Sequence, residues 1–114
     1  MDELLKQALL YDFYGELLTD HQKEIYEQFI LEDLSLGEIA RDAGISRQGV
    51  HDLVRRCNRT LQEYEEKLHL VSRFLTVKEQ IHKIREILDQ EPAEDISVLK
   101  SEIRKISDEI LEEL

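Results

Sequence analysis

The chain has 114 residues, of which 36% are charged, and its formal net charge of −11 is unusual for a nucleic-acid-binding protein, whose affinity comes largely from neutralising phosphates. Its single cysteine excludes an internal disulfide and, with no Cys/His cluster at zinc-ligand spacing, indicates a reduced cytoplasmic setting; no apolar run approaches the ~20 residues that span a bilayer, and the acidic start Met1-Asp2-Glu3 is unlike a signal peptide. One proline, four glycines and an abundance of Leu, Ile, Glu, Lys and Arg favour an all-α protein.

Apolar residues at helical spacing predict an amphipathic helix over residues 3–17. We expect Tyr11 and Tyr14 to flank its inward stripe. That stripe consists of Leu4, Leu5, Leu9, Leu10, Phe13 and Leu17. A second helix is predicted from Asp20 to about Leu31, because Thr19 and Gln22 have the spacing of a capping box.

A short third helix is predicted over residues 36–43. Ser35 and Glu38 repeat the capping-box spacing at its start. Gly44 follows its last residue, at a position where the left-handed conformation favours glycine. A start signal and a stop signal eight residues apart therefore define a helix of about two turns.

The next helix is predicted to start at Arg47, with Ser46 as its cap, and to run as far as Leu68. We expect Ile45, between the two helices, to fill the core. The inner stripe of the longer helix is Val50, Leu53, Val54, Cys57 and Leu61. Two helices joined by a tight turn that contains glycine have the layout of a helix-turn-helix, whose second helix enters the major groove of DNA.

The outer side of this second helix carries the strongest basic cluster of the sequence. Residues 46–59 contain four arginines and one aspartate, Asp52, which gives a local charge of +3. We predict that Arg47, Gln48 and His51 contact base edges and that Arg55, Arg56 and Arg59 contact phosphates, of DNA or of structured RNA. In the alternative interpretation, the motif is a three-helix scaffold whose arginines pair with neighbouring acidic residues.

Apolar residues alternate at spacings of three and four in two further stretches, the pattern of a heptad seam. The first seam is Leu70, Phe74, Val77, Ile81, Ile84 and Leu88, and the second is Ile96, Leu99, Ile103, Ile106 and Ile110. Residues 89–95, with Pro92, are predicted to form a turn, and Asp95 or Ser97 to cap the last helix. We expect an antiparallel hairpin over residues 69–114 that follows a helix-turn-helix domain over residues 1–68. Because each seam is short, the hairpin is expected to need a further surface, either the N-terminal part or a second copy in a homodimer.

Three groups of residues carry a resemblance to the promoter-reading region 4 of bacterial sigma factors. They are Thr19, Gln22 and Ile25, then Leu36-Gly37-Glu38-Ile39-Ala40, then Gly44 to Val50. Residue by residue, the sigma motif points to Ser46, Arg47, Gln48, His51 and Arg55 as contacts. Sigma domains usually carry more positive charge at the places taken here by Gly49, His51 and Asp52.

The whole chain, including the N-terminal segment 9–19 and the acidic C-terminal end, is more similar to the small YlxM family of Gram-positive bacteria. That resemblance implies a cytosolic accessory protein or regulator of the signal recognition particle pathway. Such a protein would contact the RNA or the GTPase of the particle. The alternative is a protein-interaction module that modulates this GTPase without binding nucleic acid.

The sequence gives no indication of catalytic or metal-binding chemistry. No two of the four histidines, His21, His51, His69 and His82, have the i, i+4 spacing of a helical zinc site. Cys57 falls on the inner stripe of its helix and is expected to be a buried, inert thiol. A glycine-rich phosphate loop and a nucleophile elbow are both missing from the sequence. We therefore expect no enzyme activity, no cofactor and no metal.

Overall fold

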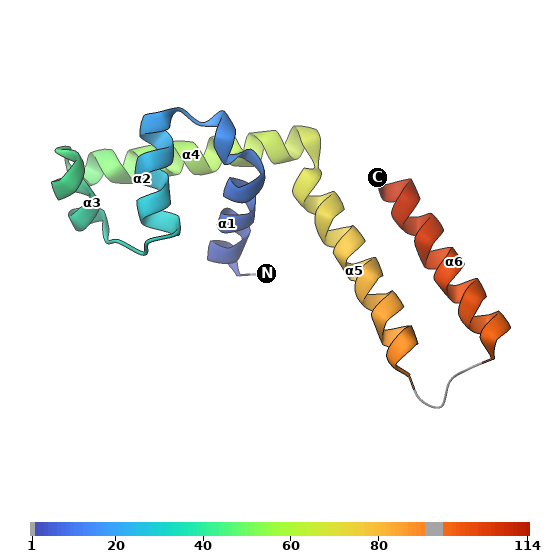
Figure 1. Ribbon diagram of the computed structural model, residues 1–114. Coiled ribbons are helices and arrows are strands. Elements are labelled where there is room, and N and C mark those ends of the chain that lie inside the picture. Colours follow the sequence, from blue (N-terminus) through green and yellow to red (C-terminus); the bar gives the residue numbers. More distant parts are fainter. Residues whose placement is uncertain (1, 91–94) are drawn as a thin grey trace. The chain divides into compact units, whose positions relative to one another are not determined.

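A computed structural model describes residues 2–90 and 95–114 of the chain (Figure 1). In these residues all regular structure is helical, which confirms the predicted all-α class. The elements are α1 (Glu3–Tyr14), the 3₁₀ turn η1 (Gly15–Leu17), α2 (Asp20–Ile30), α3 (Leu36–Ala43), α4 (Arg47–Leu68), α5 (Leu70–Asp89) and α6 (Ile96–Glu113). They form two compact units, one ending at His69 and one beginning at Leu70.

The first unit is built around α4, a helix of 22 residues. Each of α1, α2 and α3 packs against it, as the blue and cyan helices lying along the green one show in Figure 1. The side chains that are completely or almost completely buried in this unit are Tyr14, Ile25, Tyr26, Ile39, Val50, Cys57 and Leu61. Because every one of these four helices contributes at least one of them, a single core fixes α4 relative to the other three.

The predicted helix starts and stops of the first unit are confirmed. At α2 the Gln22 backbone N–H donates to Thr19 Oγ1 at 3.2 Å, and the Thr19 N–H donates to Gln22 Oε1 at 3.0 Å. The same reciprocal pair joins Ser35 and Glu38 at the start of α3. Gly44 ends α3 with φ of 70°, in the left-handed region that penalises residues with a Cβ.

The expectation for the first helix was wrong in two respects. The α-helix ends at Tyr14, and its buried side chains are Leu10, Tyr11 and Tyr14. Four residues of the predicted stripe are exposed instead: Leu4, Leu5, Phe13 and Leu17. A tyrosine ring buries a large area when its hydroxyl finds a partner, and both hydroxyls do. Tyr11 donates to Glu27 Oε1 and Tyr14 donates to Glu65 Oε1, each at 2.5 Å.

Gly15 explains why the helix stops where it does. A Cβ at this position would lie 2.7 Å from the ring of Tyr11, so only a residue without a side chain allows the ring to pack there. Burial, and then the hydrogen bond to Glu27, raise the pKa of Tyr11 well above its usual range. Tyr26 is likewise buried, with a raised pKa, and its hydroxyl donates to Asn58 Oδ1 of α4. Tyrosine hydroxyls of α1 and α2 therefore tie these helices to each other and to α4.

Ile45 was expected in the core but is 38% exposed. Ile39 and Val50, which have no exposed surface, already occupy the inner sides of α3 and α4. The Ile45 side chain lies instead over the first turn of α4, with its Cδ1 3.8 Å from the position that a Cβ on Gly49 would take. Ile45 thus covers the turn from outside and does not fill the interior.

The second unit is the predicted pair of antiparallel helices, α5 and α6, which pack against each other (Figure 1). Asp95 caps α6, with its Oδ1 accepting from the Ser97 N–H at 2.8 Å. The predicted turn around Pro92 lies largely outside the described residues. The second seam is used as expected, with Ile106 buried and Ile103 and Ile110 half-buried.

The first seam is used only in part. In α5, Val77 and Ile84 are half-buried, whereas Ile81 is 47% and Leu88 58% exposed. The seam consists of two rows of side chains, and a single partner helix lies against one side of such a seam. Since α6 lies on the side of Val77 and Ile84, the row that contains Ile81 and Leu88 stays at the surface.

Candidate nucleic-acid interface

The turn between α3 and α4 positions the candidate contact residues. Ser46 caps α4, with its Oγ accepting from the Gly49 N–H at 2.9 Å. A Cβ on Gly49 would lie 3.1 Å from this Oγ, so the small residue keeps the cap uncrowded. The hydroxyl oxygen of Ser46, a predicted contact, is therefore engaged in the local fold. The cap leaves Arg47, Gln48 and His51 exposed on the first turns of α4.

Asp52 lies beside two of the three residues that were predicted to contact bases. Gln48 Nε2 donates to Asp52 Oδ1 at 3.0 Å. His51 Nδ1 is 3.8 Å from the same oxygen, and both side chains are about half exposed. Residue spacing alone did not suggest this cluster, although Gln48 and Asp52 are four apart, a spacing at which helical side chains meet.

Three of the predicted phosphate contacts lie together on the next turns of α4. Arg55, Arg56 and Arg59 line a shallow surface depression of about 280 Å³, and Asp52 lies at its edge. All three arginines are exposed. The structure thus brings the arginines together in one place and adds a single acidic residue that was predicted to flank them.

The arginines are not neutralised by the many acidic residues of the chain. Within the described ranges 2–90 and 95–114, the ion pairs shorter than 4.0 Å are Lys23–Glu16 and His51–Asp52. Neither involves an arginine, so the pairing that the scaffold interpretation requires does not occur there. The positive charge of this face is available to a ligand.

Arg47 lies apart from the other arginines. Its Cδ is 3.9 Å from the position of a Cβ on Gly37, so the side chain runs along the first turn of α3. At 1.5 Å per residue, Arg47 and Arg59 are separated by about 18 Å along the axis of α4. The candidate residues therefore form a strip along one helix, with the polar cluster of Gln48, His51 and Asp52 near one end and the arginine depression near the other.

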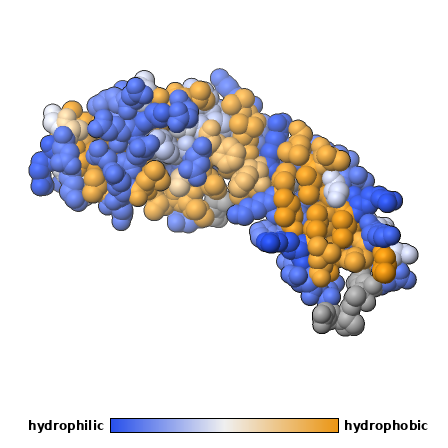
Figure 2. Space-filling model, in the orientation of Figure 1, coloured by the Kyte–Doolittle hydropathy of each residue, from blue (hydrophilic) through white to orange (hydrophobic). Residues whose placement is uncertain are grey.

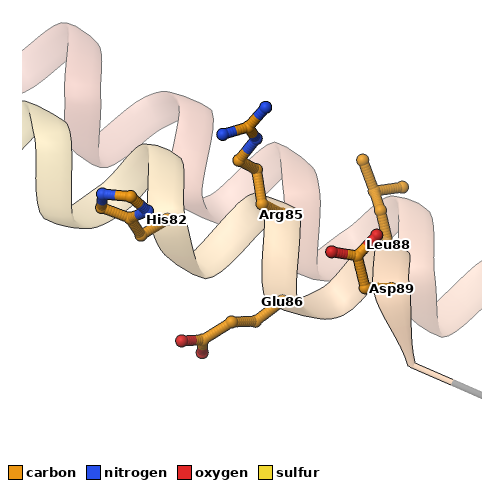
Figure 3. Close-up of a pocket in the computed structure, with 5 residues that line it drawn as sticks. All are labelled: His82, Arg85, Glu86, Leu88 and Asp89. Atoms are coloured by element: carbon orange, nitrogen blue, oxygen red, sulfur yellow. The ribbon is translucent and has the colours of Figure 1, made fainter.

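Other parts of the described surface offer no comparable arrangement. A depression of about 240 Å³ between α2 and α3 is lined by His21, Glu24, Ile25, Gln28, Asp42 and Ala43. A wider one of about 480 Å³ is lined by His82, Arg85, Glu86, Leu88 and Asp89, all on the last turns of α5 (Figure 3). Within the part of the chain that the structure describes, His, Cys, Asp and Glu side chains form no group of three that could hold a metal ion. No described helix is long and apolar enough to cross a membrane.

Cys57 is buried as predicted. Burial raises the pKa of its thiol to about 11, against a smaller opposing effect of Arg56. A thiol with so high a pKa is protonated at neutral pH and is a poor nucleophile. Cys57 therefore belongs to the core of the first unit.

Comparison with known proteins agrees with the helix-turn-helix geometry. The model of the UPF0122 family, described as helix-turn-helix and YlxM / p13 like, matches residues 1–106. The chain belongs to this family. The UPF0122 protein of Caldanaerobacter subterraneus subsp. tengcongensis is 51% identical over 87 residues, which are 76% of this chain and 74% of that protein.

Other relatives in UPF0122 align over nearly the full chain. The UPF0122 protein of a Thermoanaerobacter species is 45% identical over 113 residues, 97% of this chain and 96% of the relative. That of Acetivibrio thermocellus is 42% identical over 114 residues, 100% of this chain and 97% of the relative. UPF0122 is a helix-turn-helix family and not an enzyme family, and the predicted family membership is confirmed.

Proposed function

We propose that the protein binds nucleic acid through the outer face of α4. The observation that carries this proposal is the group of exposed arginines without carboxylate partners in the described chain, on the second helix of a helix-turn-helix. In a chain with a net charge of −11, such a cluster is the place where a polyanion is attracted and not repelled.

The contacts divide along α4. Arg55, Arg56 and Arg59 take phosphates, because their guanidinium groups line one open depression. Arg47 and Gln48, in the first turn, take base edges, guanine for arginine and adenine for the amide, and His51 lies one turn further on. The ligand is duplex DNA, in the manner of sigma region 4, or a structured RNA whose loops expose their bases.

The resemblance to the YlxM family supports a cellular setting for this binding. The protein would act in the cytoplasm as an accessory or regulatory component of the signal recognition particle pathway. In that setting the RNA of the particle is the first structured RNA to examine.

A titration at several salt concentrations against duplex DNA and against structured RNA tests the proposal. Replacing Arg55, Arg56 and Arg59 together by Ala is expected to abolish binding at moderate salt. On duplex DNA it should make the slope of log affinity against log salt shallower by about 2.7, since each phosphate contact contributes about 0.9. The proposal fails if the wild type binds neither ligand at low salt or if the triple variant binds as the wild type does.

A matched control separates a local contact from overall charge. Lys100, Arg104 and Lys105 are three exposed basic residues on α6, in the other unit. Their triple replacement by Ala changes the net charge by the same amount as the arginine variant. Binding that depends on the α4 face should survive this control largely unchanged.

A second candidate function is a protein-interaction module that modulates the targeting GTPase without binding nucleic acid. The observation that favours it is the exposed row of α5 that contains Ile81 and Leu88. Copurification with the GTPase and a change in its GTP turnover would support this function. Full modulation after deletion of residues 89–114 would exclude the hairpin as the contact. The predicted homodimer is a further use of the same unit and is treated next.

A further inference from the structure

The hairpin formed by α5 and α6 has little interior of its own. Among its described residues, Val71 and Ile106 are the two that are buried. Two helices that bury so little apolar surface do not compensate for the conformational entropy lost on ordering them. Figure 2 shows apolar side chains forming a band along the visible face of this unit, with hydrophilic residues on both sides of the band. A further surface is therefore required to cover the hairpin.

One face of α5 combines apolar and basic side chains. Lys78, Ile81, Arg85 and Leu88 are spaced by three, four and three residues, so they share one side of the helix, and all four are exposed. The Lys78 ammonium lies 5.9 Å from the centre of the Phe74 ring, which joins the charge to the apolar row. Figure 3 shows Arg85 and Leu88 pointing to the same side of α5, with Glu86 pointing away from them. We name these four residues the basic face of α5.

One face of α6 combines apolar and acidic side chains. Asp108, Leu111 and Glu112 are spaced by three and one residues and are exposed, Leu111 by 70%. Residues 106–114 contain four acidic residues and no basic one. Leu111 lies about 140° around the helix from the buried Ile106, so this side faces away from α5 of the same hairpin. We name these three residues the acidic face of α6.

The two faces cannot meet within one hairpin. Helix α5 turns Val77 and Ile84 towards α6, and α6 turns Ile103 and Ile106 towards α5. Both charged faces are therefore left outside. Their charges are opposite, and each has an exposed apolar side chain at its centre. In a closed dimer with twofold symmetry, a contact from α5 to the partner's α6 is repeated as a contact from α6 to the partner's α5.

We propose that two copies of the chain associate through their hairpins, the basic face of α5 in each copy packing on the acidic face of α6 in the other. Ile81 and Leu88 then meet Leu111 of the partner subunit in the centre. Lys78 and Arg85 lie at the edge of the contact, beside Asp108 and Glu112 of the partner subunit. The assembly is a four-helix arrangement in which the row of α5 left uncovered by α6 is covered twice, once in each copy.

Light scattering and sedimentation of the full chain at micromolar concentration test the assembly. The expected result is twice the chain mass of 13.5 kDa. A monomer at these concentrations overturns the proposal, whether the hairpin is then covered by the N-terminal unit or by a different protein.

Charge reversal tests the interface itself. The variants K78E/R85E and D108K/E112K each place like charges at both symmetric contacts, and each is expected to raise the dimer dissociation constant by about tenfold or more. Mixing the two variants restores opposite charges at both contacts, so the mixture is expected to form a heterodimer with near wild-type affinity. Circular dichroism of each variant verifies that the exposed substitutions leave the helices intact.

Two outcomes of the mixing experiment overturn the assignment. If both variants are monomeric and their mixture stays monomeric, the two faces do not contact each other. If D108K/E112K dimerises as the wild type does, a second copy uses α5 without α6. Neither outcome bears on nucleic-acid binding by α4, which the hairpin variants leave in place.

Discussion

Gln48 Nε2 donates to Asp52 Oδ1 at 3.0 Å on the exposed side of α4, one turn before the arginine depression that Asp52 also borders. A carboxylate in this place has two opposite effects on a nucleic-acid ligand. It fixes the Gln48 amide, whose carbonyl oxygen remains free to accept from a base amino group. It also repels the phosphates that Arg55 and Arg56 attract.

Replacing Asp52 by Asn should therefore strengthen binding while changing selectivity. Unit charges about 4 Å apart in water interact by about 1 kcal/mol, so the loss of repulsion is expected to raise affinity about fivefold at low salt. The gain should shrink as salt is added. Discrimination among base sequences should weaken, because Gln48 loses its fixed acceptor. Fluorescence titration with a selected sequence and with random competitor measures both effects.

Asp12→Asn is the control for this experiment, since it removes one exposed negative charge from α1. An equal gain in both variants would assign the effect to net charge and contradict a local role of Asp52. Unchanged affinity in D52N would show that phosphates do not approach this end of the depression.

The turn of the helix-turn-helix gives a stability prediction. Gly44→Ala places a Cβ at φ of 70° in open space, with no neighbouring atom within 4 Å, so the penalty comes from the backbone alone. The expected loss is roughly 1–2 kcal/mol in the free energy of unfolding, measured in urea. Gly37→Ala is the matched control, because Gly37 is helical and a Cβ there has ordinary contacts at 3.9 Å. That variant should be as stable as the wild type or slightly more stable.

Local sequence signals predicted the motif well because each depends on few residues. The reciprocal caps at Thr19 and Ser35, the stop at Gly44 and the cap at Ser46 act over three or four positions, and the structure has all of them. The side of α1 that packs inward does not depend on local spacing. It is decided by Glu27 and Glu65, distant in sequence, which accept from the hydroxyls of Tyr11 and Tyr14.

The candidate site was predicted as residues but not as an arrangement. The arginine cluster could be counted from the sequence, whereas the lack of acidic partners around it could not, because pairing depends on where the acidic side chains fold. Ile81 and Leu88 show the same limit for apolar residues. A heptad pattern states that two rows need covering but does not state how many helices cover them.

The hydrogen bond between Tyr14 and Glu65 anchors α1 to α4 and gives a second stability prediction. Tyr14→Phe keeps the ring and removes the hydroxyl that donates at 2.5 Å. The expected loss is about 0.5–1.5 kcal/mol in the free energy of unfolding, because one partly buried hydrogen bond is lost without a cavity. Tyr64→Phe, on an α4 side chain whose ring lies 6.0 Å from that of Tyr14, is the control for altered ring contacts. If the two variants have equal stability, the bond to Glu65 contributes nothing.

Buried groups in the first unit predict how stability depends on alkaline pH. Burial raises the pKa of Cys57 from an ordinary 9.0 to about 11, and the pKa values of Tyr11 and Tyr26 are also raised above the usual tyrosine value. Above pH 9 the unfolded chain therefore loses protons that the folded chain retains. Stability rises with pH only where the unfolded state binds more protons, so here it must fall as pH increases through this range. Urea unfolding from pH 7 to pH 11 is expected to show a decline that begins near pH 9.

Cys57→Ala isolates the contribution of the thiol to this decline. The variant should be less stable at pH 7, because a buried side chain is shortened, but its loss of stability between pH 9 and pH 10 should be smaller than that of the wild type. The tyrosines then account for the decline that remains above pH 10. In the same pH range a thiol reagent should modify the wild type only as fast as the first unit opens, and rapid modification of the folded protein at pH 8 would contradict the burial of Cys57.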